Sequence, residues 1–195
     1  MNRPSSESAR QKIQTASRRV AWACSGLMIA VPVSAAAYWA MADGVALRAE
    51  WQMAAEGWSL GRCVPNDAAD AAMTPAFRLI GFALTMLPVS AVLLALVNLR
   101  RLFRLYARGA MFGTSNVAAF RGLGWALILF GAAQFAFGPL SSLALSSGNP
   151  VGQRFLSVGV GSDMVLAVVA GMVLVIVAWV MDEARRIDEE QTFTV

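Results

Sequence analysis

Side chains that usually do chemistry are scarce in this 195-residue chain. The chain has no histidine, so the commonest general base and metal ligand is absent. Inside the long apolar stretches the strongly polar side chains are Asn98 and Gln134, with Arg78 and Asp163 at the stretch ends. Titratable groups inside a membrane are costly and are usually kept for a function. We therefore expect a protein that is not an enzyme and has no catalytic residues, metal site or cofactor, although composition alone does not exclude a membrane enzyme.

The strongest concentration of charge is LRRLFRLYARG at residues 99–109, which we predict to be an amphipathic helix. At 100° per residue its apolar side chains gather on one face: Leu99, Leu102, Phe103 and Tyr106. The basic side chains occupy the opposite face: Arg100, Arg101, Arg104 and Arg108. Such a face suits an acidic protein partner or anionic lipid, where each basic group contributes on the order of 1 kcal/mol. Taken alone, the helix is most simply a topology signal.

Composition places this helix in a membrane protein, since 57% of the residues are hydrophobic and only 14% are charged. A helix that rises about 1.5 Å per residue needs about 20 apolar residues to cross the hydrocarbon. Backbone groups in lipid must satisfy one another, and barrel strands would be only about half as long. The fold class is therefore all-α, a polytopic membrane protein. Its four transmembrane helices are predicted at residues 20–42, 76–99, 122–145 and 163–181.

Five other segments flank these predicted helices. They are a basic leader (1–19), an outer segment with an amphipathic helix (43–75), the arginine-rich helix and its loop (100–121), a glycine-rich outer loop (146–162) and a tail (182–195). The small residues in the first apolar stretch are typical of a cleaved signal peptide. Its apolar core is too long for one, however, so a retained membrane anchor is favoured. Gly109 should end the arginine helix, and Thr114 or Ser115 should cap the next one.

The orientation follows from the basic residues, which resist translocation. The leader and the 100–121 loop carry five each and the tail two, whereas the remaining four are Arg48, Arg62, Arg78 and Arg154. Both termini and the arginine helix are therefore predicted in the cytoplasm. Tryptophans at the ends of the apolar stretches agree with this arrangement, because amphipathic rings prefer both membrane interfaces. They are Trp22, Trp125 and Trp179 on the inner side, and Trp39, Trp51 and Trp58 on the outer side.

Packing signals are stronger than chemical ones. Ala132 with Ala136, and Ala167 with Gly171, form pairs of small residues four apart that let helices approach closely. Gln134 is expected to donate an interhelical hydrogen bond. An outer-face ion pair between Arg78 and Asp163 would tighten the bundle. Prolines should bend three of the helices, at Pro32, Pro88 and Pro139.

The second half of the chain resembles a bacterial family of four-span membrane proteins catalogued as a domain of unknown function. The matching residues are LRRLFRLYARGAMFGTSNVAAFRGLGWALI (99–128) and the closing EARRIDEEQTFTV (183–195). In that family a basic helix leads through a glycine and a phenylalanine to an Arg-x-x-Gly-Trp entry, here Gly109, Phe112, Asn116, Arg121, Gly124 and Trp125. Members are often encoded beside a small Xre-type helix-turn-helix regulator. The resemblance implies that this protein senses or tethers such a regulator.

Our leading hypothesis is a non-enzymatic protein of the bacterial inner membrane whose cytoplasmic face binds a partner such as a transcriptional regulator. Direct nucleic-acid binding is not expected, because no helix-turn-helix, zinc spacing or single-strand-binding pattern accompanies the arginines. The alternative is a small transporter, or an immunity-type protein acting against a membrane-active compound, which the prolines and the outer segment suggest. The sequence leaves the oligomeric state open.

Overall fold

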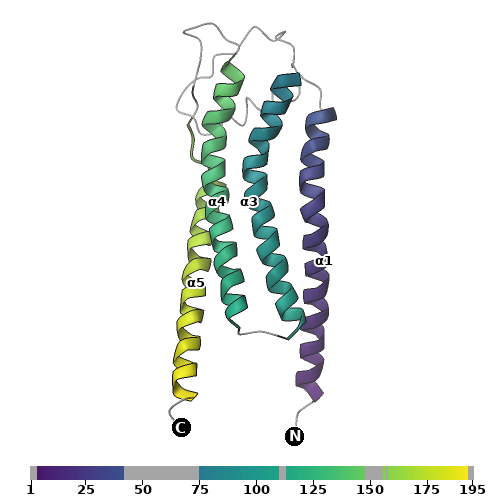
Figure 1. Cartoon of the computed structure of the whole chain (residues 1–195), viewed down its shortest axis with the longest axis vertical. Coiled ribbons are helices and arrows are strands. Elements are labelled where there is room, and N and C mark those ends of the chain that lie inside the picture. The colour runs from purple at the N-terminus through teal and green to yellow at the C-terminus, as the bar shows by residue number, and fades with distance from the viewer. Residues whose placement is uncertain (1–3, 42–74, 110–112, 148–155, 157, 193–195) are drawn as a thin grey trace. The chain divides into compact units, whose positions relative to one another are not determined.

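All secondary structure in the described part of the chain is helical. The structure, a computed structural model, describes residues 4–41, 75–109, 113–147, 156 and 158–192. Its helices are α1 (Pro4–Met41), α3 (Pro75–Ala107), α4 (Thr114–Ser146) and α5 (Ser162–Thr192) (Figure 1). Each contains a segment long and apolar enough to cross a membrane. The predicted set of four membrane-spanning helices is confirmed.

All four helices extend well past the apolar stretches that define them. α1 begins at Pro4, within the predicted leader, and α5 continues beyond residue 181 to Thr192. After Pro4 the leader has no glycine or further proline before residue 20, and proline itself suits the first helical position. α3 passes without a break from its apolar stretch to Ala107, so the predicted arginine helix is the end of α3. The predicted outer amphipathic helix lies outside the described residues.

The turn after α3 has the glycine that its geometry requires. Gly109 has φ +79°, a left-handed conformation that side chains other than glycine rarely adopt. The amides of Arg108 and Gly109 donate to the carbonyls of Leu105 (3.1 Å) and Tyr106 (3.0 Å), which closes the helix end. Thr114 then begins α4, and the Gly113 carbonyl accepts the first backbone hydrogen bonds, from Asn116 (2.9 Å) and Val117 (3.4 Å). The predicted helix end at Gly109 is confirmed, and capping by Thr114 or Ser115 stays a prediction.

Most of the fully buried side chains are small, whereas many large apolar side chains point outward. Alanines at 119, 126 and 178 are completely buried, and the serines at 141 and 142 are nearly so. Exposed large side chains occur on all four helices, among them Ile29, Leu79, Leu129 and Leu166. In water such a surface would be strongly unfavourable, whereas lipid accommodates it and small residues let membrane helices approach closely. This distribution is that of a multi-pass membrane protein.

The chain divides into two compact units, and each helix contributes a segment to both. The basic unit comprises Met1–Ile29, Val92–Ile128 and Val168–Val195; the proline unit comprises Ala30–Ala91 and Leu129–Ala167. The arginine end of α3 belongs to the basic unit. Pro32, Pro88 and Pro139 all lie inside helices of the proline unit.

The proline unit is fastened at one end by a tryptophan that the sequence placed at the outer interface. Trp39 is only 3% exposed, because the edge of its six-membered ring occupies the space at Gly81 of α3, where there is no side chain. Its Nε1 donates to the Thr85 hydroxyl oxygen (3.1 Å), and that hydroxyl donates to the Gly81 carbonyl (2.8 Å). Trp39 is therefore a packing residue joining α1 to α3, a contact that the sequence did not indicate, and its predicted depth at the outer interface stays a prediction. Trp51 and Trp58 lie outside the described residues.

Arg78 strengthens the same junction. Its Nη1 donates to the carbonyl oxygens of Trp39 (3.0 Å) and Ala40 (3.3 Å), near the end of α1. The last carbonyls of a helix lack partners within the helix and carry partial negative charge, so a cation there is favourable. The Arg78 guanidinium therefore caps α1, while the predicted ion pair with Asp163 stays a prediction.

The basic unit is held by a glycine crossing between α4 and α5. A Cβ atom built on Gly124 would lie 2.7 Å from the Gly171 carbonyl oxygen, and one built on Gly171 would lie 2.7 Å from the Gly124 carbonyl oxygen. The two backbones therefore touch with no room for a methyl group on either helix. Beside this crossing, the Asn98 side chain of α3 packs over Gly122 of α4.

Candidate functional site

The arginines at the end of α3 form a stripe on one face of the basic unit. Arg100, Arg104 and Arg108 are spaced four residues apart, which puts them on the same side of a helix, and Arg101 lies on the adjacent face. Arg100 is half-buried and the other three are exposed. The sequence predicted this set, and the structure places all four around one open depression.

The opposite face of this end of α3 is apolar and packs against the protein, which holds the arginine stripe in place. Leu102 is buried, and the half-buried rings of Phe103 and Tyr106 meet edge to face, with their centroids 6.2 Å apart. Aromatic pairs prefer this geometry, and their burial fixes the rotation of the helix about its axis. The predicted division into an apolar and a cationic face is thus present in the structure.

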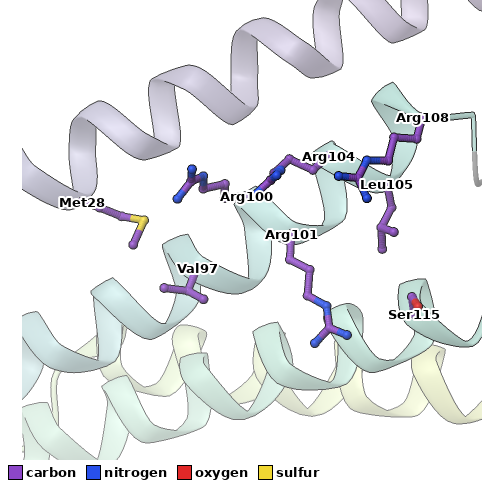
Figure 2. A pocket seen from close by; sticks show the side chains of 8 residues that line it. All are labelled: Met28, Val97, Arg100, Arg101, Arg104, Leu105, Arg108 and Ser115. Atoms are coloured by element: carbon purple, nitrogen blue, oxygen red, sulfur yellow. The ribbon is translucent and has the colours of Figure 1, made fainter.

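Two open depressions flank the stripe, each of about 370 Å³. Arg100, Arg104 and Arg108 line both of them. Figure 2 shows the first, in which Arg100, Arg104 and Arg108 extend along the α1 side of α3 while Arg101 points toward α4. Its other lining residues are Met28, Val97, Leu105 and Ser115.

The second depression lies between α1 and α3 and adds a fifth arginine. From α1 it is lined by Arg18, Ala21, Trp22 and Ser25. Arg18 is exposed, and Trp22 is 74% exposed. The sequence placed Arg18 only in the basic leader, and it assigned Trp22 to the inner interface without relating either residue to the α3 arginines. The sequence could have related them, because α1 and α3 are consecutive predicted spans that run in opposite directions. The start of α1 and the end of α3 are therefore expected at the same end of the bundle.

These five arginines lack acidic partners within the described residues. In the described part of the basic unit, acidic side chains form ion pairs within α5. There Arg185 pairs with Asp182 (3.7 Å) and Arg186 with Glu183 (3.3 Å). Like charges on one surface repel one another, and an anion that neutralises several of them relieves that repulsion. The arrangement therefore supplies an anion-binding surface.

The small residues predicted for helix packing have different surroundings. Gly171 is buried at the α4–α5 crossing, Ala136 and Ala167 are half-buried, and Ala132 is exposed. The small-residue pattern on α5 thus indicated Gly171 but gave no indication of its contact, Gly124. Gln134 is half-buried in α4 of the proline unit, and its predicted interhelical hydrogen bond stays a prediction.

The described residues contain no group of three or more His, Cys, Asp or Glu side chains that could hold a metal ion. Cys24 is buried in α1 as a free thiol.

Comparison with known proteins identifies a family. A family model described as "Protein of unknown function (DUF2975)" matches residues 62–195, which include α3, α4 and α5. This match extends further toward the N-terminus than the segments on which the resemblance rested. Neither the curated proteins nor the solved structures include a match to the chain.

Proposed function

Since this chain belongs to the DUF2975 family of proteins of unknown function, we propose its function from its arginine surface: it is a non-enzymatic membrane protein that tethers an acidic cytoplasmic partner. The arginine surface is here the set Arg100, Arg101, Arg104 and Arg108. The proposal places the protein in the bacterial inner membrane, with both termini and the arginine surface on the cytoplasmic side, as the distribution of basic residues predicts.

One observation carries the proposal: the four arginines are held on a fixed helix face and have no acidic partner in the described part of the chain. From Arg100 to Arg108 the stripe is about 12 Å long at 1.5 Å per residue. A partner helix with acidic side chains at the same four-residue spacing would present a complementary stripe. Guanidinium groups also bind carboxylates with two parallel hydrogen bonds, which adds geometric specificity.

A DNA-binding regulator is the partner class that we propose, on the strength of the family resemblance in the arginine helix and the tail. Capture at the membrane would remove such a regulator from its DNA sites. The arginine surface would then act as a tether whose occupancy sets the amount of free regulator.

The proposal is tested by affinity capture of the full-length protein from detergent-solubilised membranes. Exposed ion pairs contribute about 0.2–1 kcal/mol each, and reversing a charge adds a repulsion of similar size, so four charge reversals should weaken binding by at least about tenfold. We expect that Glu at Arg100, Arg101, Arg104 and Arg108 together removes a specific cytoplasmic protein from the captured material.

The matched control is Arg185→Glu with Arg186→Glu. It reverses two charges on α5 that already have acidic partners, and it should retain the captured protein. Recovery of every cytoplasmic partner by the fourfold variant, at the level of the unchanged protein, would overturn the proposal.

A further inference from the structure

Two depressions lie beside the arginine stripe, and Arg100, Arg104 and Arg108 line both of them. The second is lined from α1 by Arg18, Trp22 and Ser25, and the first reaches the apolar side chains of Met28 on α1 and Val97 on α3. α1 and α3 run in opposite directions in the basic unit (Figure 1). Their cationic residues therefore meet at one end and their apolar residues at the other.

The dimensions of this gradient match the polar and upper apolar parts of one phospholipid. Arg18 and Met28 are separated by about 15 Å along α1, and Val97 and Arg108 by about 16 Å along α3, at 1.5 Å per residue. Arg100, Arg104 and Arg108 follow the predicted span at residues 76–99, which puts them at the expected depth of the lipid headgroups, while Met28 and Val97 lie within the predicted spans at residues 20–42 and 76–99.

We propose that this surface binds one anionic phospholipid of the cytoplasmic leaflet. Its phosphate and acidic headgroup lie among Arg18, Arg100 and Arg104. Its acyl chain extends along Met28 and Val97. Trp22, which is exposed beside Arg18, packs on the glycerol and headgroup region, where amphipathic rings are favoured.

The apolar end of the gradient favours a lipid over a soluble anion or an acidic peptide. Val97 is 46% exposed and, with Met28, lines the depression that also holds the arginines. Free phosphate or a peptide carboxylate gains nothing from these two side chains. A phospholipid joins a phosphate to an acyl chain covalently, so the arginines and the apolar residues bind the same molecule.

This inference goes beyond the proposed function because it assigns α1 residues that partner binding does not require. In Figure 2 Arg101 points toward α4 and away from α1. Arg100 and Arg104 serve both proposals, so a bound lipid and an acidic partner would compete for them, whereas Arg101 contacts the partner alone. The lipid test uses the purified protein alone, so its failure and a failure of partner capture are separate results.

The experiment is native mass spectrometry of the detergent-purified full chain, titrated with phosphatidylglycerol or phosphatidylcholine of identical acyl chains. We expect the unchanged protein to retain phosphatidylglycerol at least tenfold more tightly than phosphatidylcholine. Arg18→Gln with Arg100→Gln should remove this preference, whereas Arg18→Lys with Arg100→Lys should keep most of it because charge is retained.

The matched control is Lys12→Gln with Arg19→Gln, which removes two cations from the same helix at a separate depression. It should leave the preference unchanged, and all variants should elute as the unchanged protein does in gel filtration. If glycerol 3-phosphate displaces the bound phosphatidylglycerol, the surface is a site for soluble anions. If a polyglutamate peptide displaces it, the surface is a peptide site. Equal binding of the two lipids, an equal loss in the control, or displacement by either competitor at equimolar concentration would overturn the inference.

Discussion

Gly171→Leu is expected to lower the free energy of unfolding by about 3 kcal/mol or more, at the upper end of what overpacking costs. The substituted Cβ would lie 2.7 Å from the Gly124 carbonyl oxygen and 2.8 Å from Cγ1 of Ile128. A backbone carbonyl cannot rotate away as a side chain can, so α4 and α5 must separate. Thermal unfolding in detergent, followed by the loss of monodisperse protein, should show a decrease in Tm of about 6–12 °C.

Ala132→Leu is the matched control for this substitution, because Ala132 is an exposed small residue on α4. Its larger side chain meets lipid or detergent, and the Tm should change by no more than about 2 °C, as expected for surface substitutions. Gly171→Ala should already lower the Tm, since the alanine Cβ is the atom that meets the carbonyl oxygen. Equal Tm values for Gly171→Leu and Ala132→Leu would show that the two helices do not cross at this glycine.

The second large effect is expected at Gly81, where leucine should lower the free energy of unfolding by about 2 kcal/mol. The added side chain would occupy the position of the Trp39 indole. The ring would have to leave its buried site and give up its hydrogen bond to Thr85. Thermal unfolding in detergent again measures the loss.

A double-mutant cycle distinguishes this explanation from a general intolerance of leucine at position 81. Trp39→Leu removes the indole, so Gly81→Leu should cost much less in that background than in the unchanged protein. The coupling between residues in direct contact is typically about 0.5–3 kcal/mol. Additive effects of the two substitutions would mean that Trp39 does not pack on Gly81.

The sequence was sufficient to predict the spans and the end of α3 at Gly109, but not the extension of α1 to Pro4 or of α5 to Thr192. Unbroken apolar stretches define membrane helices because the bilayer requires their length and their internal hydrogen bonds. The end of α3 could be predicted for an equally local reason, since Gly109 adopts a conformation that glycine favours. The four arginines of the candidate site followed from helical periodicity within one segment.

Contacts between helices could not be predicted in the same way. A span that faces lipid is apolar all around, so its sequence does not mark which side meets a neighbour. The crossing of Gly124 with Gly171 and the burial of Trp39 on Gly81 both depend on how adjacent helices align. The same holds for Arg18, whose place beside Arg100 and Arg104 requires the register of α1 against α3.

Trp39 illustrates that a tryptophan near the end of a span can also pack between helices. Tryptophan prefers the membrane interface because its ring is apolar and its N–H is polar. At Trp39 the Thr85 hydroxyl accepts the N–H and Gly81 leaves room for the ring, so both parts are satisfied inside the protein. Trp22, Trp125 and Trp179 have no such arrangement and are exposed.

The proposals for partner and lipid binding share one premise, that the arginine surface faces the cytoplasm, and cysteine accessibility measures this directly. With Cys24 and Cys63 replaced by alanine, single cysteines are placed at Ser115, which lines the arginine depression, and at Ser162, at the start of α5. A membrane-impermeant maleimide is then applied to intact and to permeabilised spheroplasts. We expect Ser162→Cys to react in both and Ser115→Cys only after permeabilisation. Labelling of Ser115→Cys in intact spheroplasts would place the arginines outside and contradict the account.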